Sequence, residues 1–118
     1  MRILIVDDDK TFCEFLAEVL GQKGDDVDWT THSLEGYKMF LQKHYDLSVL
    51  DVRMSPLPGT DLAEKLKQQS PGTNIILISA FADEARRRTA QSLGLPLRSK
   101  PFSTDNFLDL VEKTAAGQ

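Results

Sequence analysis

The chain has 118 residues, carries 14 lysines and arginines against 18 aspartates and glutamates, and is 41% hydrophobic. This length is typical of one folded domain, and the formal charge of −4 argues against a nucleic-acid-binding module, which normally carries a basic stripe. The single cysteine excludes an internal disulfide, and the aliphatic run at 3–6 is too short for a signal sequence or a membrane span. We therefore expect one domain over 1–118, located in the cytoplasm, with no membrane or direct nucleic-acid partner.

Short apolar runs alternate with amphipathic stretches along the chain. The runs at 3–6, 47–50 and 75–78 are nearly continuous and rich in β-branched residues, which predicts strands covered on both faces of a parallel sheet. The run at 27–31 alternates polar and apolar residues and predicts an edge strand. The run at 95–98 contains a proline, which is tolerated mainly at strand starts and sheet edges.

Helical patterns separate these strands, at 10–22, 34–43, 59–69, 83–92 and 104–115. Their ends carry typical capping residues: Asp9 before the first helix, Gly94 after the fourth and Ser103 before the last. Five strand–helix units in strict alternation predict a doubly wound α/β fold, because neighbouring parallel strands need helical crossovers.

Four of the five predicted strands end in residues that can carry chemistry. Three carboxylates follow the first strand, one carboxylate follows the third, a hydroxyl follows the fourth and an ammonium group follows the fifth: Asp7, Asp8, Asp9, Asp51, Ser79 and Lys100. The carboxyl ends of strands are where such folds bind ligands. Clustered carboxylates without histidine or cysteine favour a hard cation, Mg²⁺ or Mn²⁺. A metal, a lysine and a hydroxyl around a nucleophilic carboxylate are suited to handling a phosphoryl group.

These residues carry a family resemblance. The segments 3–9 (ILIVDDD), 50–54 (LDVRM), 78–80 (ISA) and 100–102 (KPF) resemble, in order and spacing, the receiver domain of response regulators in two-component signalling. The resemblance implies a flavodoxin-like (βα)5 fold with strand order 2-1-3-4-5. It also implies a phosphorelay module that takes a phosphoryl group from a histidine kinase or a phosphotransfer protein. Such a module is not an enzyme in the usual sense, because it catalyses only its own phosphoryl uptake and loss.

The same resemblance assigns roles at the acidic positions. Asp51 matches the phosphoacceptor, and Asp7 and Asp8 match the acidic pair that binds Mg²⁺ together with Asp51. Arg53 would contribute its backbone carbonyl to the metal. Asp9 is expected to cap the first helix instead of binding the metal.

The resemblance assigns Ser79 as the switch hydroxyl and Lys100 as the lysine that pairs with the phosphoryl group. The chain also departs from the family pattern. Three positions before Lys100, where an aromatic residue is usual, it has Leu97, and the segment 95–99 is one residue shorter than usual. The segment 54–56 reads Met-Ser-Pro, so the usual proline is displaced by one. We expect phosphorylation to be retained and its transmission through the fifth strand to be altered.

Two surfaces are candidates for partners. Phe12 and Phe15 lie on the first helix near the acidic cluster, where the resemblance places the kinase or phosphotransfer protein; ordinary core packing is the alternative. Arg86, Arg87 and Arg88 lie on the fourth helix and belong to the face of the fourth helix, fifth strand and fifth helix that receivers use for dimers or effectors. A solvated helix surface is the alternative, because acidic residues precede this run.

Two other functions share this fold class. A flavodoxin-like flavin carrier needs a phosphate-binding loop rich in serine, threonine or glycine after the first strand, where this chain has three aspartates that would repel a phosphate. A degenerate receiver would serve as a constitutive interaction module. The retained Asp8, Asp51, Ser79 and Lys100 favour an active phosphoacceptor over both.

Overall fold

The structure, a computed structural model, describes residues 1–116 and has five strands that alternate with five helices. The strands are β1 (Arg2–Val6), β2 (Asp26–Thr30), β3 (Leu47–Asp51), β4 (Ile75–Ser79) and β5 (Leu97–Ser99). The helices are α1 (Lys10–Gln22), α2 (Ser33–Gln42), α3 (Gly59–Gln69), α4 (Glu84–Leu93) and α5 (Thr104–Ala115). All strands are parallel in the order β2-β1-β3-β4-β5, which confirms the predicted fold class and strand order.

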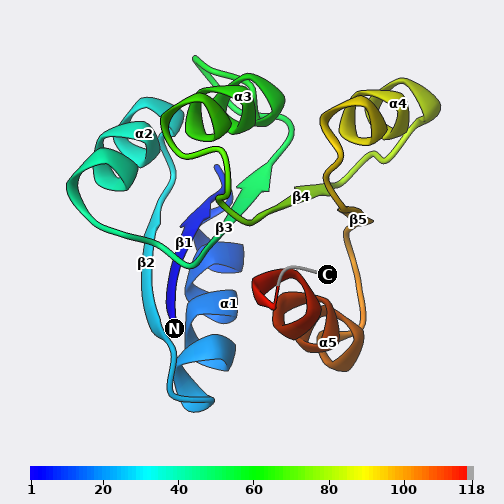
Figure 1. The fold of residues 1–118 in the computed structure, drawn as a ribbon. Helices are drawn as coiled ribbons and strands as arrows, with labels where there is room; N and C mark the ends of the chain where they lie inside the picture. Colours follow the sequence, from blue (N-terminus) through cyan, green and yellow to red (C-terminus); the bar gives the residue numbers. More distant parts are fainter. Residues whose placement is uncertain (117–118) are drawn as a thin grey trace.

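The helices cover both faces of the sheet, with α1 and α5 on one side and α2, α3 and α4 on the other (Figure 1). Successive side chains of a strand point to opposite faces, so each strand contributes to two cores. In β1, Ile3 and Ile5 pack with the buried residues of α1 and α5, whereas Leu4 and Val6 pack with those of α3 and α4. The sheet is therefore the middle layer of a three-layer sandwich.

The burial of the strands follows their positions in the sheet. Every residue of β3 and of β4 is buried, because both strands are covered on both faces and flanked by neighbours. The edge strands β2 and β5 are only partly buried, as the polar residues of β2 and the proline just before β5 indicated. Within residues 1–116, no helix is both long and apolar enough to cross a membrane.

The structure confirms the helices at 10–22, 59–69 and 104–115 and shifts the bounds of the other seven predicted elements by one or two residues. The second strand and second helix each begin one residue earlier than predicted, and the fourth helix begins one residue later. Its predicted first residue, Asp83, is instead the N-cap, and its side chain accepts a hydrogen bond from the Arg86 N–H.

The fifth strand differs most from its predicted range of 95–98. The Leu95 N–H donates to the Ala90 carbonyl and closes the last turn of α4. Pro96 has no N–H, and its carbonyl accepts from Leu77. Regular pairing with β4 therefore begins only at Leu97, which lies opposite Leu77.

Gly59 brings the start of α3 against the end of β3. Its N–H donates to the Val52 carbonyl at 3.0 Å. A Cβ atom at this position would lie 1.9 Å from the Asp51 carbonyl oxygen, closer than any real contact. The loop that follows Asp51 can thus fold back over the strand end only with a glycine here.

Candidate functional site

A cavity of about 760 Å³ opens at the carboxyl end of the sheet. Its walls come from the loop after β1, the segment from the end of β3 to the start of α3, the loop after β4, the start of α4 and the residue after β5: Asp8, Asp9, Asp51, Val52, Arg53, Met54, Ser55, Pro58, Thr60, Ala80, Arg86 and Lys100. Segments far apart in the sequence meet here because parallel strands present their carboxyl ends at one edge. Of the residues predicted for the site, Asp8, Asp51, Arg53 and Lys100 line this cavity.

Three carboxylates meet in this site. Asp7, Asp8 and Asp51 each offer an oxygen, and these oxygens lie within 4.8 Å of one another. Asp8 and Asp51 line the cavity, whereas Asp7 is fully buried behind them. A donor set made only of carboxylate oxygens fits a hard cation such as Mg²⁺, so these residues match the metal that the sequence implied.

Asp51 is nearly buried, with 5% of its surface exposed. Burial and the charge of Asp7 raise the pKa of Asp51 to about 7. Burial also raises the pKa of Asp7, against the opposing effect of its hydrogen bond with Lys100. A cation bound among these groups would relieve their repulsion, which is a physical reason for metal binding that does not depend on resemblance.

Lys100 holds a fixed position beside the carboxylates. Its Nζ donates to Asp7 Oδ2 at 2.6 Å and lies 4.1 Å from the centroid of the Phe12 ring. The other Asp7 oxygen, Oδ1, accepts from the Asp9 N–H at 2.9 Å. Asp7 thus anchors Lys100, and the ammonium group lines the cavity that contains Asp51.

Ser79 is buried at the end of β4, with its hydroxyl turned to the loop that follows the strand. The hydroxyl donates to the Phe81 carbonyl at 2.7 Å and accepts from the Phe81 N–H at 3.0 Å. Ser79 is adjacent to the cavity through Ala80 but does not line it. In this state the hydroxyl holds the β4–α4 loop instead of facing the carboxylates.

Arg53 lines the cavity two residues after Asp51. Its N–H lies 3.4 Å from Asp51 Oδ1, a long hydrogen bond, and its guanidinium lies over the Phe81 ring with 5.6 Å to the centroid. The assignment of its carbonyl as a metal ligand stays a prediction. Asp9 caps α1, since its side chain accepts from the Phe12 N–H, as the sequence indicated.

The arginine run of α4 does not form one outward face. Arg86 lines the cavity and is partly buried, whereas Arg87 and Arg88 are exposed. The sequence grouped Arg86 with Arg87 and Arg88 as one candidate partner surface, and this assignment stays a prediction. Asp83, three positions before Arg86, pairs with the Arg86 guanidinium.

An apolar groove of about 390 Å³ adjoins the site. It is lined by Phe12, Phe15, Lys100, Pro101 and Phe102. The Phe12 ring meets Phe102 edge to face, with 5.9 Å between centroids, so Phe12 also belongs to the core. Phe15 is 49% exposed and has a free face.

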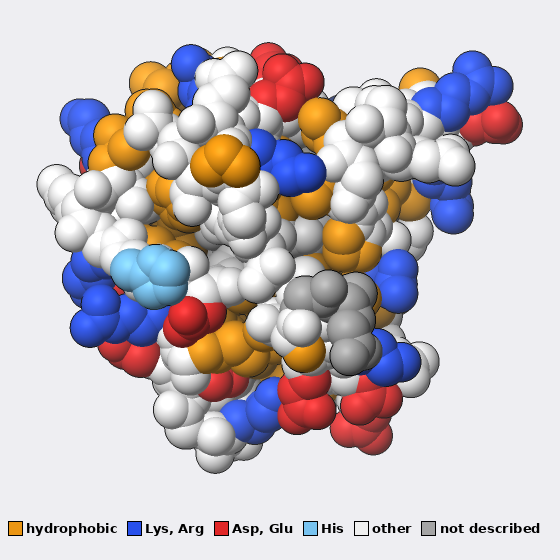
Figure 2. All heavy atoms as spheres, viewed as in Figure 1, with side chains coloured by type: hydrophobic (Ala, Val, Ile, Leu, Met, Phe, Trp, Pro, Cys, Tyr) orange, Lys and Arg blue, Asp and Glu red, His pale blue; other side chains and the backbone are white. Residues whose placement is uncertain are grey.

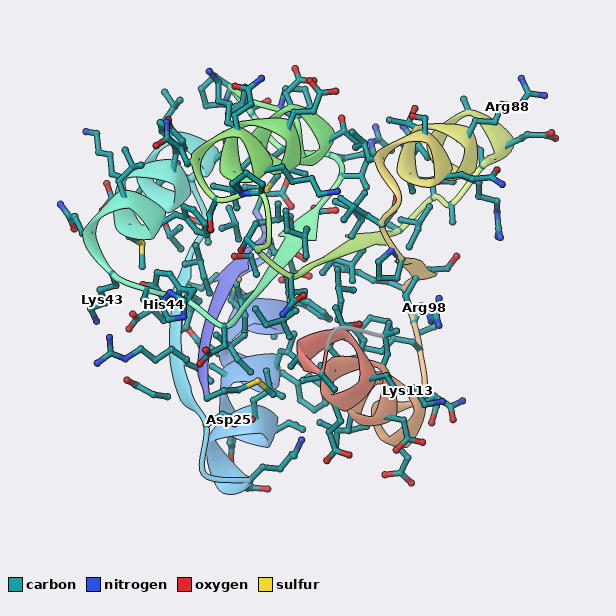
Figure 3. All side chains as sticks on the ribbon, viewed as in Figure 1. Asp25, Lys43, His44, Arg88, Arg98 and Lys113 are labelled. Carbon is teal, nitrogen blue, oxygen red and sulfur yellow. The ribbon has the colours of Figure 1, made fainter. Side chains whose placement is uncertain are left out.

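The fifth strand has no aromatic residue near the site. Leu97 is partly buried and packs against the core on the α4 side of the sheet. Arg98 is exposed, and its guanidinium donates to the carbonyl of Leu97 (Figure 3). Among residues 1–116, no acidic side chain forms an ion pair with Arg98.

Comparison with known proteins gives the same assignment as the motifs. The family model described as "Response regulator receiver domain" matches residues 3–112. The transcriptional regulatory protein CusR of Escherichia coli K12 is 32% identical over 112 residues, which are 94% of this chain and 49% of CusR. The chain spans about half the length of the curated relatives it matches.

Solved structures agree with this match. The response regulator protein TrrA from Thermotoga maritima, solved in complex with Mg²⁺ and beryllofluoride, has a TM-score of 0.86 and 30% identity, with 96% of this chain and 97% of that chain covered. The beryllofluoride-activated NtrC4 receiver domain dimer has a TM-score of 0.92 and 26% identity, with coverage of 98% and 97%. The resemblance inferred from the sequence is confirmed.

Proposed function

This chain belongs to the response regulator receiver domain family, and we propose that it accepts a phosphoryl group on Asp51 in a Mg²⁺-dependent reaction. The observation that carries the proposal is the convergence of four groups at one cavity. Asp51, Asp8 and Asp7 bring their carboxylates within 4.8 Å, and Lys100 lies beside them, held by Asp7. Of the three carboxylates that line the cavity, Asp51 is the one that we place between the proposed metal-binding pair, Asp7 and Asp8, and Lys100.

In the proposed reaction, an Asp51 carboxylate oxygen attacks the phosphorus of the donor. A new P–O bond forms, the bond from phosphorus to the donor breaks, and its electron pair leaves with the donor, which takes up a proton. The nucleophile must be ionised, so the raised pKa of Asp51 matters for the reaction. Bound Mg²⁺ would neutralise phosphoryl charge, with Asp8 and Asp51 as its cavity-facing ligands and Asp7 and the Arg53 carbonyl completing its site. Lys100 would neutralise a further oxygen.

The donor is proposed to be the phosphohistidine of a sensor histidine kinase or a phosphotransfer protein. The groove between Phe12, Phe15 and Phe102 adjoins the site and offers an apolar surface to a partner helix. Phe15 is the better anchor, because half of its surface is exposed while Phe12 packs against Phe102. We place this exchange in the cytoplasm.

The phosphorylated domain is proposed to act as a signal and not as a turnover enzyme. The relatives include CusR, a transcriptional regulator of which this chain spans half, and the activated NtrC4 receiver is a dimer. By analogy, α4, β5 and α5 would form a surface for a second copy or an effector, with Arg87 and Arg88 on it.

The two alternative functions are less well supported. A degenerate receiver would have lost part of the site, whereas Asp8, Asp51, Ser79 and Lys100 are all present at their strand ends. A flavin carrier would place a phosphate where three carboxylates repel it.

Phosphoryl uptake tests the proposal directly. With a small phosphodonor and Mg²⁺, intact mass spectrometry is expected to show one phosphate per chain, and chelation of the metal should prevent its addition. Asp8→Ala should need much more Mg²⁺ for the same rate of phosphoryl uptake, because it removes a proposed metal ligand that faces the cavity. Asp9→Asn is a matched control, since Asn also caps helices well. Absence of uptake by the wild type would refute the proposed function.

The fifth strand is expected to respond weakly to phosphorylation. Leu97 has no ring to swing between positions, so residues 95–99 should change less than the loops at 54–56 and 79–81. Backbone amide chemical shifts with and without beryllofluoride and Mg²⁺ measure this difference. If the largest chemical-shift changes in the domain occur at residues 95–99, the prediction of a weak response in the fifth strand is wrong.

A further inference from the structure

The three arginines of α4 differ in what they contact. Arg88 pairs with Glu84 at 3.0 Å and points away from the sheet at the outer end of the helix (Figure 3). Figure 2 shows basic side chains gathered over this end of α4 with an acidic side chain beside them. Arg87 donates from Nε to the Ala82 carbonyl. Only Arg86, among these three, lines the cavity that contains Asp51.

A replaceable ion pair holds the Arg86 side chain. Its guanidinium donates to Asp83 Oδ2 at 2.7 Å, and the side chains of Arg86 and Asp83 are 27% and 54% exposed. Exposed pairs of this kind contribute little to stability, so a stronger anion can displace the Asp83 carboxylate. The other Asp83 oxygen caps the helix through the Arg86 N–H and does not depend on the guanidinium.

The other two cationic side chains that line the cavity, Lys100 and Arg53, have other partners than Arg86 has. Lys100 is bound to the buried carboxylate of Asp7, and the Arg53 guanidinium lies over the Phe81 ring. A phosphoryl group on Asp51 would carry up to about two negative charges and three acceptor oxygens. A guanidinium presents its donors as a fork that binds phosphoryl oxygens in pairs, which an ammonium group cannot do.

We propose that Arg86 is a phosphoryl-binding residue whose guanidinium exchanges the Asp83 carboxylate for the phosphoryl group on Asp51. This inference rests on the proposed function of Asp51. Because Arg86 lies in the first turn of α4, the exchange would couple the phosphoryl group directly to that helix. The coupling needs no aromatic residue on β5, where this chain has Leu97.

Beryllofluoride with Mg²⁺ is the probe, and its dissociation constant is measured for each variant by amide chemical shifts. Arg86→Gln is expected to weaken binding by about tenfold, because it removes a charged hydrogen-bond donor. Arg88→Gln makes the same charge change on the same helix, outside the cavity, and should stay within about twofold of the wild type. Asp83→Asn keeps a capping residue but weakens the ion pair that competes for Arg86. This variant should therefore bind beryllofluoride several-fold more tightly, a gain that corresponds to the strength of a surface ion pair.

The possible outcomes separate the two proposals. If the wild type does not bind the probe, the proposed function itself is wrong. If the wild type binds and Arg86→Gln binds equally well, or loses no more than Arg88→Gln, only the role of Arg86 is refuted. Should Arg86→Gln fail to fold, Asp83→Asn decides, since unchanged or weaker binding by this variant contradicts the exchange.

Discussion

Asp51→Asn is expected to lose all phosphoryl uptake while folding more stably than the wild type at about pH 7 and above. The loss follows because a neutral amide is not a nucleophile toward phosphorus, and no other carboxylate within residues 1–116 has the same surroundings. Asp8 is at the rim, Asp9 caps α1, and Asp7 is buried behind the cavity and bound to Lys100. One substitution should therefore remove the activity and leave the fold intact.

The gain in stability comes from the cost of burying the charge. The pKa of Asp51 is about 7 in the folded chain against an ordinary value of 3.8. Between these values the unfolded chain loses the proton and the folded chain keeps it, so the free energy of unfolding of the wild type falls as pH rises and levels off above the upper value. Asparagine has no such cost. Without metal, its advantage should grow across this window by about 2 kcal/mol or more.

Urea unfolding of both proteins in chelator, at several pH values, measures this difference. Asp9→Asn is the control, because it removes a carboxylate from the same cavity. Its free energy of unfolding should stay within about 0.5 kcal/mol of the wild type, and the variant should keep phosphoryl uptake. Added Mg²⁺ should stabilise the wild type more than Asp51→Asn, because a bound ligand favours the state that holds it. Equal free energies of unfolding of the wild type and Asp51→Asn at every pH would show that burial of the Asp51 charge has no cost.

Gly59→Ala is expected to be the most disruptive glycine-to-alanine substitution among the glycines of residues 1–116. Its Cβ would lie 1.9 Å from the carbonyl oxygen and 2.6 Å from the carbonyl carbon of Asp51, both backbone atoms that cannot turn aside. Overpacking of this kind costs about 1–3 kcal/mol, and here the backbone of the phosphoacceptor itself must shift. Both stability and the rate of phosphoryl uptake should fall.

Gly21→Ala is the matched control, because nothing lies within 4 Å of its added Cβ. Gly21 lies near the end of α1, where alanine should stabilise the helix by about 0.5–1 kcal/mol. Chemical denaturation and the initial rate of phosphorylation of both variants measure the contrast. A Gly59→Ala variant as stable and as active as Gly21→Ala would contradict the close approach of α3 to β3.

Much of the fold followed from local patterns. The continuous apolar runs that became β1, β3 and β4 were readable because strands buried on both faces need apolar side chains at every position. Asp9 and Ser103 were recognisable as caps, since their side chains accept hydrogen bonds from N–H groups only three residues further along. The start of β5 could not be predicted locally. It depends on two hydrogen bonds to other elements, from the Leu95 N–H to α4 and from β4 to the Pro96 carbonyl.

For the site, the sequence by itself determined the chemistry and its approximate place. Asp7, Asp8, Asp51 and Lys100 follow strands, and parallel strands bring their carboxyl ends to one edge, so these groups had to meet. Only the tertiary structure decided what depends on side-chain direction, burial and distances between separate elements. It turns Arg86 into the cavity and the Ser79 hydroxyl toward Phe81, raises the pKa of Asp51, and presses Gly59 against the Asp51 carbonyl. These properties arise from contacts between segments far apart in the chain, which no local pattern of residues encodes.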